Sequence, residues 1–248
     1  MHLFTSEGIV IHKLKYLESD LIVTIFSITE GKIKAIVKGG VNSRKRFPGA
    51  FEVGNIGEFG FTAKNPYQLM YINHAKVNDY LIDLKKDYDK IIMLFYILGI
   101  TDAMLIEHQS HPKLFEFLVY TIQFLEKNKA LNQVRLFYEF HLLKETGLLP
   151  AIEKCESCGM AFAGNRVNFL QQTGKLVCES CIPHNTGSFP IPDNLLLLIK
   201  AVNNNSLNMD EFLIVDVPHA MFDITTRLMS NYIDRPLKIW QMIDTICF

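Results

Sequence analysis

The sequence lacks any apolar run long enough to cross a membrane. Its longest uninterrupted apolar stretch is IIMLFYILGI, residues 91–100, whereas a helix needs about 20 such residues to span a bilayer. The N-terminal MHLFTSEGIV has no basic region followed by a long apolar region, so no signal peptide is expected. These absences predict a cytoplasmic protein with no membrane partner.

The motifs of common enzyme classes are also missing. The patterns GxGxxG, GxxxxGK[ST], HExxH and GxSxG do not occur, which leaves no sign of a dinucleotide fold, a P-loop, a zinc protease or a nucleophile elbow. The eight histidines are isolated from one another and form no ligand or triad pattern. We therefore expect a binding protein with no catalytic residue.

Strong net charge is absent, but the charge is unevenly distributed. The whole chain of 248 residues carries −1, with 49% hydrophobic and 21% charged residues, as in an ordinary folded protein. Residues 1–80 alone have a net charge of +3, and residues 32–46 contain six basic residues and no acidic one. Such a local field can bind an anion that the whole protein would repel.

The periodicity of the chain changes near Asp83. Before it, five runs rich in Val, Ile, Phe and Tyr are separated by turn residues, and they predict strands at 7–16, 20–28, 31–38, 51–61 and 68–77. Five short strands favour a small barrel or a compact sandwich. After it, helical spacing predicts a helix that includes residues 88–106 and further helices at 112–125, 131–146, 193–203 and 219–232. The predicted fold class is α+β.

Four of the five cysteines form the pattern C-x2-C-x19-C-x2-C: Cys155, Cys158, Cys178 and Cys181. Two C-x2-C turns bring four thiolates together in the tetrahedral arrangement that Zn²⁺ accepts. Disulfides are disfavoured in a cytoplasmic chain, and a redox pair remains an alternative. Because four thiolates fill the coordination shell, the predicted site holds one structural zinc ion. The fifth cysteine, Cys247, is interpreted as a free thiol.

The cysteine segment has little positive charge of its own. Between the outer cysteines, Arg166 and Lys175 are offset by Glu156 and Glu179, and four thiolates around Zn²⁺ add a charge of about −2. This segment therefore repels phosphate, which favours a structural site that holds the loop closed rather than a nucleic-acid site.

The basic segment is GKIKAIVKGGVNSRKRFPG, residues 31–49. With a period of two, Ile33, Ala35 and Val37 share one face of the strand, and the lysines at 32, 34 and 38 share the other. Lysines and arginines on a small barrel supply the phosphate contacts of sequence-independent nucleic-acid binding. The alternative is a solvated basic loop. Nearby aromatic residues could stack on bases or belong to the core: Phe26, Phe47, Phe51, Phe59 and Phe61.

Three motifs resemble those of the bacterial recombination mediator family RecO. The first covers residues 7–52, with Gly8-Ile9-Val10, Glu18-Ser19-Asp20, Gly31-Lys32-Ile33 and Lys38-Gly39-Gly40 followed by Ser43–Arg46. The second is RLFYEFHLLKETGLLPAIEKCESCG at 135–159, and the third is Arg235-Pro236-Leu237-Lys238. Trp240 departs from the pattern, since a smaller polar residue is expected there.

The resemblance implies a domain order and a function. It implies an oligonucleotide/oligosaccharide-binding (OB) barrel over 1–80, a helical domain over 81–150 and 186–248, and a zinc-finger-like insertion over 151–185. It also implies a non-enzymatic protein that binds single- and double-stranded DNA and anneals complementary strands. With the partner RecR, such a protein helps to load RecA onto strands coated by single-stranded DNA-binding protein.

The resemblance also implies site residues. DNA binding is carried over to the basic strand and loop: Lys32, Lys34, Lys38, Arg44, Lys45 and Arg46. The tail of single-stranded DNA-binding protein is expected on the helical domain near Arg135, although an arginine beside Leu136 can equally be a packed helix residue. Two other hypotheses are a zinc-dependent hydrolase acting on nucleic acid and a scaffold that binds only proteins.

Overall fold

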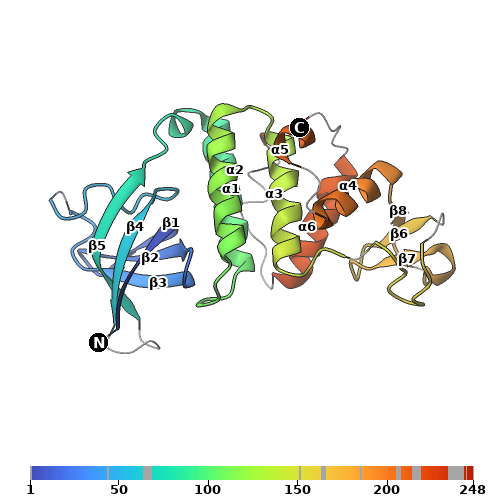
Figure 1. The fold of residues 1–248 in the computed structure, drawn as a ribbon, viewed down its shortest axis with the longest axis horizontal. Helices are drawn as coiled ribbons and strands as arrows, with labels where there is room; N and C mark the ends of the chain where they lie inside the picture. The colour runs from blue at the N-terminus through green and yellow to red at the C-terminus, as the bar shows by residue number, and fades with distance from the viewer. Residues whose placement is uncertain are drawn as a thin grey trace. The chain divides into compact units, whose positions relative to one another are not determined.

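The structure is a computed structural model. It describes residues 2–43, 45–63, 69–150, 152–162, 166–184, 186–204, 208–213, 219–233, 243 and 245–247. The chain divides into two compact units, Met1–Leu131 with Leu237–Phe248, and Asn132–Pro236 (Figure 1). The closing motif at 235–238, Trp240 and Arg44 lie outside the described residues.

The first unit contains a closed five-stranded barrel (Figure 1). Its strands are β1 (His2–Tyr16), β2 (Asp20–Ser27), β3 (Gly31–Val37), β4 (Ile56–Ala63) and β5 (Met70–Asp79). Around the barrel they follow the order β1-β2-β3-β5-β4. The long β1 makes closure possible, because one part pairs with β4 and the other with β2. The predicted five-stranded barrel and the α+β fold class are confirmed.

Alternation along the strands builds the barrel interior. Ile33, Ala35 and Val37 of β3 are fully buried, as the period of two predicts. The phenylalanines that could stack on bases are core residues, since Phe26, Phe47, Phe51, Phe59 and Phe61 are all buried. Burying these rings contributes to barrel stability through the apolar area removed from water.

The fourth predicted strand begins later than the sequence pattern indicates. Residues 51–54 form turns, and β4 starts at Ile56. Gly54 has a φ of +91°, a left-handed conformation that an extended strand does not contain. Phe51 packs into the hydrophobic core of the barrel. Its apolar side chain is therefore explained by burial in a turn and does not indicate a strand.

Two helices complete the described core of this unit. A short 3-10 turn, η1 (Leu84–Lys86), precedes α1 (Tyr88–Met104) and α2 (Pro112–Lys127). The Asp87 carboxylate caps α1 by accepting hydrogen bonds from the backbone N–H groups of Asp89 and Lys90. Phe115 of α2 packs edge-on against Phe26 of β2, with ring centroids 5.7 Å apart, and this contact joins helices and barrel into one core.

The connection between α1 and α2 lies along β3. The backbone N–H of His108 donates to the Lys32 carbonyl over 3.0 Å, and Lys32 forms an isolated parallel bridge with Glu107. A Cβ atom at Gly31 would lie 1.9 Å from the Gln109 carbonyl oxygen. Only glycine permits this close approach of two backbones.

The second unit combines helices with a small sheet (Figure 1). Its helices are α3 (Leu131–Glu145), α4 (Asp193–Asn203), α5 (Met209–Phe212) and α6 (His219–Tyr232), and α4 and α6 have the predicted bounds. The strands β6 (Val167–Leu170), β7 (Leu176–Cys178) and β8 (Ser188–Pro190) form a sheet of order β7-β6-β8. The 3-10 turn η2 (Glu179–Cys181) follows β7. The pattern of the sequence did not predict these strands, because three or four residues are too few to show a period.

Within the described part of the chain, every helix is too short or too polar to cross a membrane.

Candidate nucleic-acid interface and metal site

Lys32 lies between the barrel and a helix. Its side chain is almost buried, and the residue is 9% exposed. The ammonium nitrogen lies 3.3 Å from an Asp102 carboxylate oxygen, and it also donates to the Asp102 backbone carbonyl. A charge withdrawn from water is tolerated when it is paired and hydrogen-bonded in this way. Lys32 therefore joins β3 to the end of α1.

Lys34 and Lys38 point to solvent but also have acidic neighbours. Lys34 lies 2.5 Å from Glu107 and Lys38 lies 3.1 Å from Asp20. The pKa of Asp20 is lowered, first by the hydrogen bond that its carboxylate accepts from the Gly39 N–H and then by Lys38. The hydrogen bond to Asp20 raises the pKa of Lys38. Each of the three strand lysines is thus balanced by one carboxylate.

The loop between β3 and β4, called the basic loop below, carries two further cations within the described residues, and neither has an acidic neighbour of the kind that the strand lysines have. Lys45 and Arg46 are exposed, and no carboxylate within the described ranges forms an ion pair with either. Arg46 donates to the Asn73 carbonyl over 3.1 Å and lies 4.7 Å above the Phe47 ring. These contacts fix the direction of the guanidinium while leaving it open to an anion.

Two lysines that the sequence reasoning missed lie beside this loop. Lys13 and Lys15 of β1 line a shallow pocket of about 240 Å³, together with Ser43 and Gly40 of the loop after β3. Lys13 pairs with Glu52, also on that loop. The signal was present in the sequence HKLKY, where lysines alternate with apolar residues at the end of a strand.

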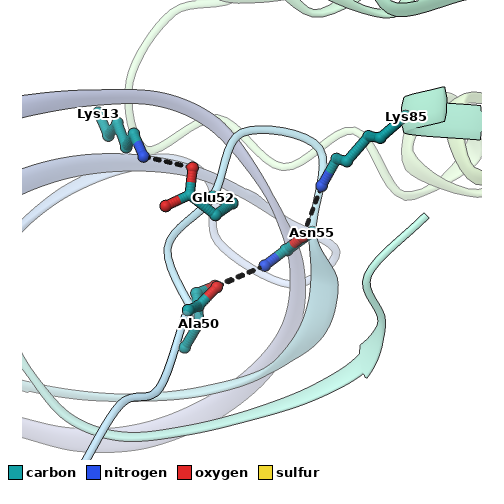
Figure 2. A network of polar contacts seen from close by, with 6 residues as sticks. Lys13, Ala50, Glu52, Asn55 and Lys85 are labelled. Atoms are coloured by element: carbon teal, nitrogen blue, oxygen red, sulfur yellow. Dashed lines mark hydrogen bonds and ion pairs between the residues drawn. The ribbon is translucent and has the colours of Figure 1, made fainter. Parts of the chain in front are cut away.

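A polar network holds the basic loop against the barrel and η1 (Figure 2). Asn55 is fully buried, and its side-chain amide donates to the carbonyls of Gly49 (2.9 Å) and Ala50 (3.3 Å). Lys85 donates to the Asn55 side-chain oxygen over 2.8 Å. Partial burial lowers the pKa of Lys85, which Glu52 partly opposes. Asn55 thereby positions the loop that carries the cations.

The four predicted ligand cysteines come together in the second unit. The sulfur atoms of Cys155, Cys158, Cys178 and Cys181 all lie within 4.8 Å of one another, and the Cys158 and Cys178 sulfurs are 3.9 Å apart. Gly159 makes the first knuckle possible, because its φ of +75° turns the chain directly after Cys158. The second knuckle is the end of β7 and the turn η2.

The surroundings of two of the sulfurs act in opposite directions, favouring a thiolate at Cys155 and a thiol at Cys181. Backbone N–H groups of Ser157 and Cys178 both donate to the Cys155 sulfur over 3.4 Å. Burial raises the pKa of the Cys155 thiol, but the backbone N–H groups outweigh burial and bring the pKa to about 6. Hydrogen bonds that the Cys181 thiol donates to the neighbouring sulfurs, that of Cys158 first, raise the pKa of Cys181 to about 12. Four sulfur donors at these separations fit one metal ion, and the S4 set fits zinc.

Arg135 lies in the interior of the second unit. It is 3% exposed, and its guanidinium Nε lies 2.9 Å from the Glu139 carboxylate. The guanidinium also lies 4.4 Å from the centre of the Phe222 ring, and Thr225 donates to the other Glu139 oxygen. Arg135 is thus a packed helix residue, and its contact with a partner protein stays a prediction.

Two family models cover most of the chain. Residues 1–81 match the model described as Recombination protein O N terminal, and residues 85–241 match Recombination protein O C terminal. The boundary between the matches falls just after β5, where the barrel ends.

Curated relatives agree with the family models. A DNA repair protein RecO of Pelobacter propionicus is 33% identical over 184 residues, 74% of each chain. One from Syntrophus aciditrophicus is 31% identical over 177 residues, 71% of this chain and 68% of that protein. One from Alkaliphilus metalliredigens is 26% identical over 233 residues, 93% of this chain and 92% of that protein. The chain therefore belongs to the RecO family of DNA repair proteins.

Proposed function

We propose that this protein is a recombination mediator that performs no bond chemistry. It binds single- and double-stranded DNA, anneals complementary strands and, together with RecR, helps to load RecA onto DNA coated by single-stranded DNA-binding protein. It acts in the cytoplasm. The observation that carries the proposal is the closed barrel with an exposed basic loop in a chain of the RecO family.

The proposed annealing mechanism is electrostatic. Two complementary strands repel each other through their phosphates, and lysines and arginines that neutralise phosphates release condensed counterions. Lys45 and Arg46 suit this role because they are exposed and have no described carboxylate partner. Lys15 extends the positive charge along the pocket beside the loop, and Lys13 can exchange its partner Glu52 for a phosphate. Binding should therefore be sensitive to salt and nearly independent of base sequence.

The strand lysines take different parts in this proposal. Lys34 and Lys38 reach solvent and can exchange their carboxylate partners for phosphates. Lys32 is held by Asp102 and the end of α1, so its main contribution is to fix the orientation of β3.

The zinc ion, in this proposal, stabilises the segment that contains the four cysteines. Zinc supplies the folding energy of small loops that lack a core of their own. Cys155, Cys158, Cys178 and Cys181 would all hold it, which leaves no open position for an activated water. This favours a binding function over a zinc-dependent hydrolase.

The salt dependence of single-strand binding tests the proposal. We expect Arg44→Ala/Lys45→Ala/Arg46→Ala to weaken binding and to lower the slope of log K against log[salt] by up to about 2, because each single-strand phosphate contact contributes about 0.7. The matched control removes three exposed lysines near α2: Lys113, Lys127 and Lys129. Unchanged affinity and slope in the first variant, or an equal loss in both, would show that the basic loop is not the site.

A further inference from the structure

Two exposed tyrosines stand on the outer surface of the barrel. Tyr16 ends β1 and is 39% exposed, and Tyr71 lies in β5 and is 40% exposed. They contrast with five of the six phenylalanines in residues 1–80, whose rings are buried in the core, while Phe4 is partly buried against it. An aromatic ring that remains at the surface has a π-face available to a ligand.

Strand register places Tyr71 in an apolar row across four strands. Tyr71 pairs with Ile36, Ile36 with Ile22, and Ile22 with Leu14. Residues paired directly across strands point to the same side of the sheet. This side is the outside, because the neighbouring Ala35 and Val37 point into the barrel. Both ends of the row are exposed, Leu14 at 57% and Tyr71 at 40%, whereas Ile36 between them is only 6% exposed.

A second row, next to the first, contains Tyr16 and a cation. Tyr16 pairs with Asp20 across the hairpin of β1 and β2. Asp20 binds Lys38, whose ammonium nitrogen lies 5.9 Å from the centre of the Tyr71 ring. Lys38 is thus near both tyrosines. It lies at cation–π distance from Tyr71 and binds Asp20, the residue that pairs with Tyr16. The surface combines two aromatic rings, apolar neighbours and a positive charge.

We infer that this surface is a base-stacking site for single-stranded DNA, with Tyr16 and Tyr71 as the stacking residues. The inference rests on the proposed function and names the form of DNA that the barrel prefers. Aromatic side chains stack on a base only when that base is out of the duplex, which selects single strands. Lys34 on β3 and Lys38 just after it supply the phosphate contacts beside the stacked bases.

The chemistry of the surface favours this occupant over a second copy of the chain. A nucleic-acid strand offers phosphate to Lys34 and Lys38 and bases to the two rings, a combination that matches both the charge and the aromatic character of the surface. Stacking also differs from phosphate contact in its salt dependence. Loss of stacking lowers affinity without releasing fewer counterions, so the salt slope is unchanged.

The test compares two labelled oligonucleotides of about 20 nucleotides, oligothymidine and an abasic strand with the same phosphates. We expect the wild type to bind oligothymidine more tightly, and Tyr16→Ala/Tyr71→Ala to lose about tenfold per tyrosine on oligothymidine alone. The salt slope should stay at the wild-type value. Tyr16→Phe/Tyr71→Phe should retain the preference, because phenylalanine keeps the ring. Tyr88→Ala, at a 71% exposed position on α1, is the control.

The outcomes separate this inference from the function on which it rests. Equal wild-type binding to both oligonucleotides, or a preference that survives Tyr16→Ala/Tyr71→Ala, overturns the stacking site and leaves DNA binding by the basic loop intact. A change of oligomeric state in that variant with an unaltered preference makes the surface a dimer contact and also overturns the inference. No wild-type binding to either strand overturns the proposed function itself.

Discussion

The ammonium nitrogen of Lys32 lies 3.3 Å from a carboxylate oxygen of Asp102. The strand pattern places this lysine on a basic face, and the contact shows that one end of this face lies against the end of α1 and the residues that follow it. Lys34 extends the contact through its ion pair with Glu107. The lysines of β3 therefore differ in burial and in role: Lys32, against α1, is nearly buried, and Lys34, farther along the strand, is exposed.

Replacing Lys32 should affect stability more than replacing Lys34. Lys32→Ala leaves the Asp102 carboxylate without its cation in a partly buried place, and we expect a loss of about 2 kcal/mol in the free energy of unfolding. Lys34→Ala removes an exposed pair and should cost less than about 1 kcal/mol. Guanidinium unfolding of both variants measures this difference, and equal losses would contradict the assigned role of Lys32.

Asn55 should control the order of the basic loop. Asn55→Ala removes two hydrogen bonds to loop carbonyls and one from Lys85. Because the residue is fully buried, we expect a loss of about 2–3 kcal/mol. Trypsin should also cleave faster after Lys45 and Arg46. In the control Glu52→Ala, which removes the exposed pair with Lys13 and keeps the Asn55 hydrogen bonds, stability should change by less than about 1 kcal/mol. A normal cleavage rate in Asn55→Ala would show that other contacts hold the loop.

His141 should make the protein sensitive to acid. Burial lowers its pKa to about 4, partly opposed by the hydrogen bond between its Nδ1 and the Phe137 carbonyl. Between pH 6.5 and 4 the unfolded chain binds a proton there that the folded chain does not, so stability falls with decreasing pH. The shift corresponds to about 3 kcal/mol. In His141→Gln the dependence of unfolding free energy on pH should be flatter over this range, and identical pH profiles would refute the prediction.

The four cysteines should hold one zinc ion that folds its own segment. Purified protein should contain one zinc per chain, and Cys158→Ser should lose most of it, whereas Cys247→Ala should keep it. A chelator should expose residues 152–184 to proteolysis because the sulfurs are the contacts that close both knuckles. Single-strand binding by the barrel should persist without zinc. Zinc retained in Cys158→Ser, or lost in Cys247→Ala, would contradict this assignment.

The sequence contained enough information to predict the long elements and the cluster of four cysteines. Alternation in β3 and helical spacing in α2, α4 and α6 are clear in the sequence because apolar residues recur several times with the period of each element. The cysteine spacing predicts the cluster of four sulfurs because a zinc site needs few residue types at fixed separations. Patterns of this kind depend only on residues that are close together in the sequence.

Contacts between distant segments could not be predicted in the same way. No local pattern indicates that Asp102 and Glu107 reach the lysines of β3, because the approach depends on how the α1–α2 connection packs against Gly31. The sequence pattern predicts a strand at Phe51 and the structure shows a turn, because a buried turn and a buried strand both require an apolar residue. The rows that contain Tyr16 and Tyr71 could not be predicted, because they depend on the register of four strands in the closed barrel.

Strand annealing by the purified protein tests the central claim most directly. The assay follows the pairing of two complementary labelled oligonucleotides with the wild type and with Arg44→Ala/Lys45→Ala/Arg46→Ala, with zinc content measured on both samples. The account predicts faster annealing with the wild type than without protein, and loss of most of this acceleration in the variant at unchanged zinc content. Annealing at the same rate with both proteins, or no acceleration by the wild type, would contradict it.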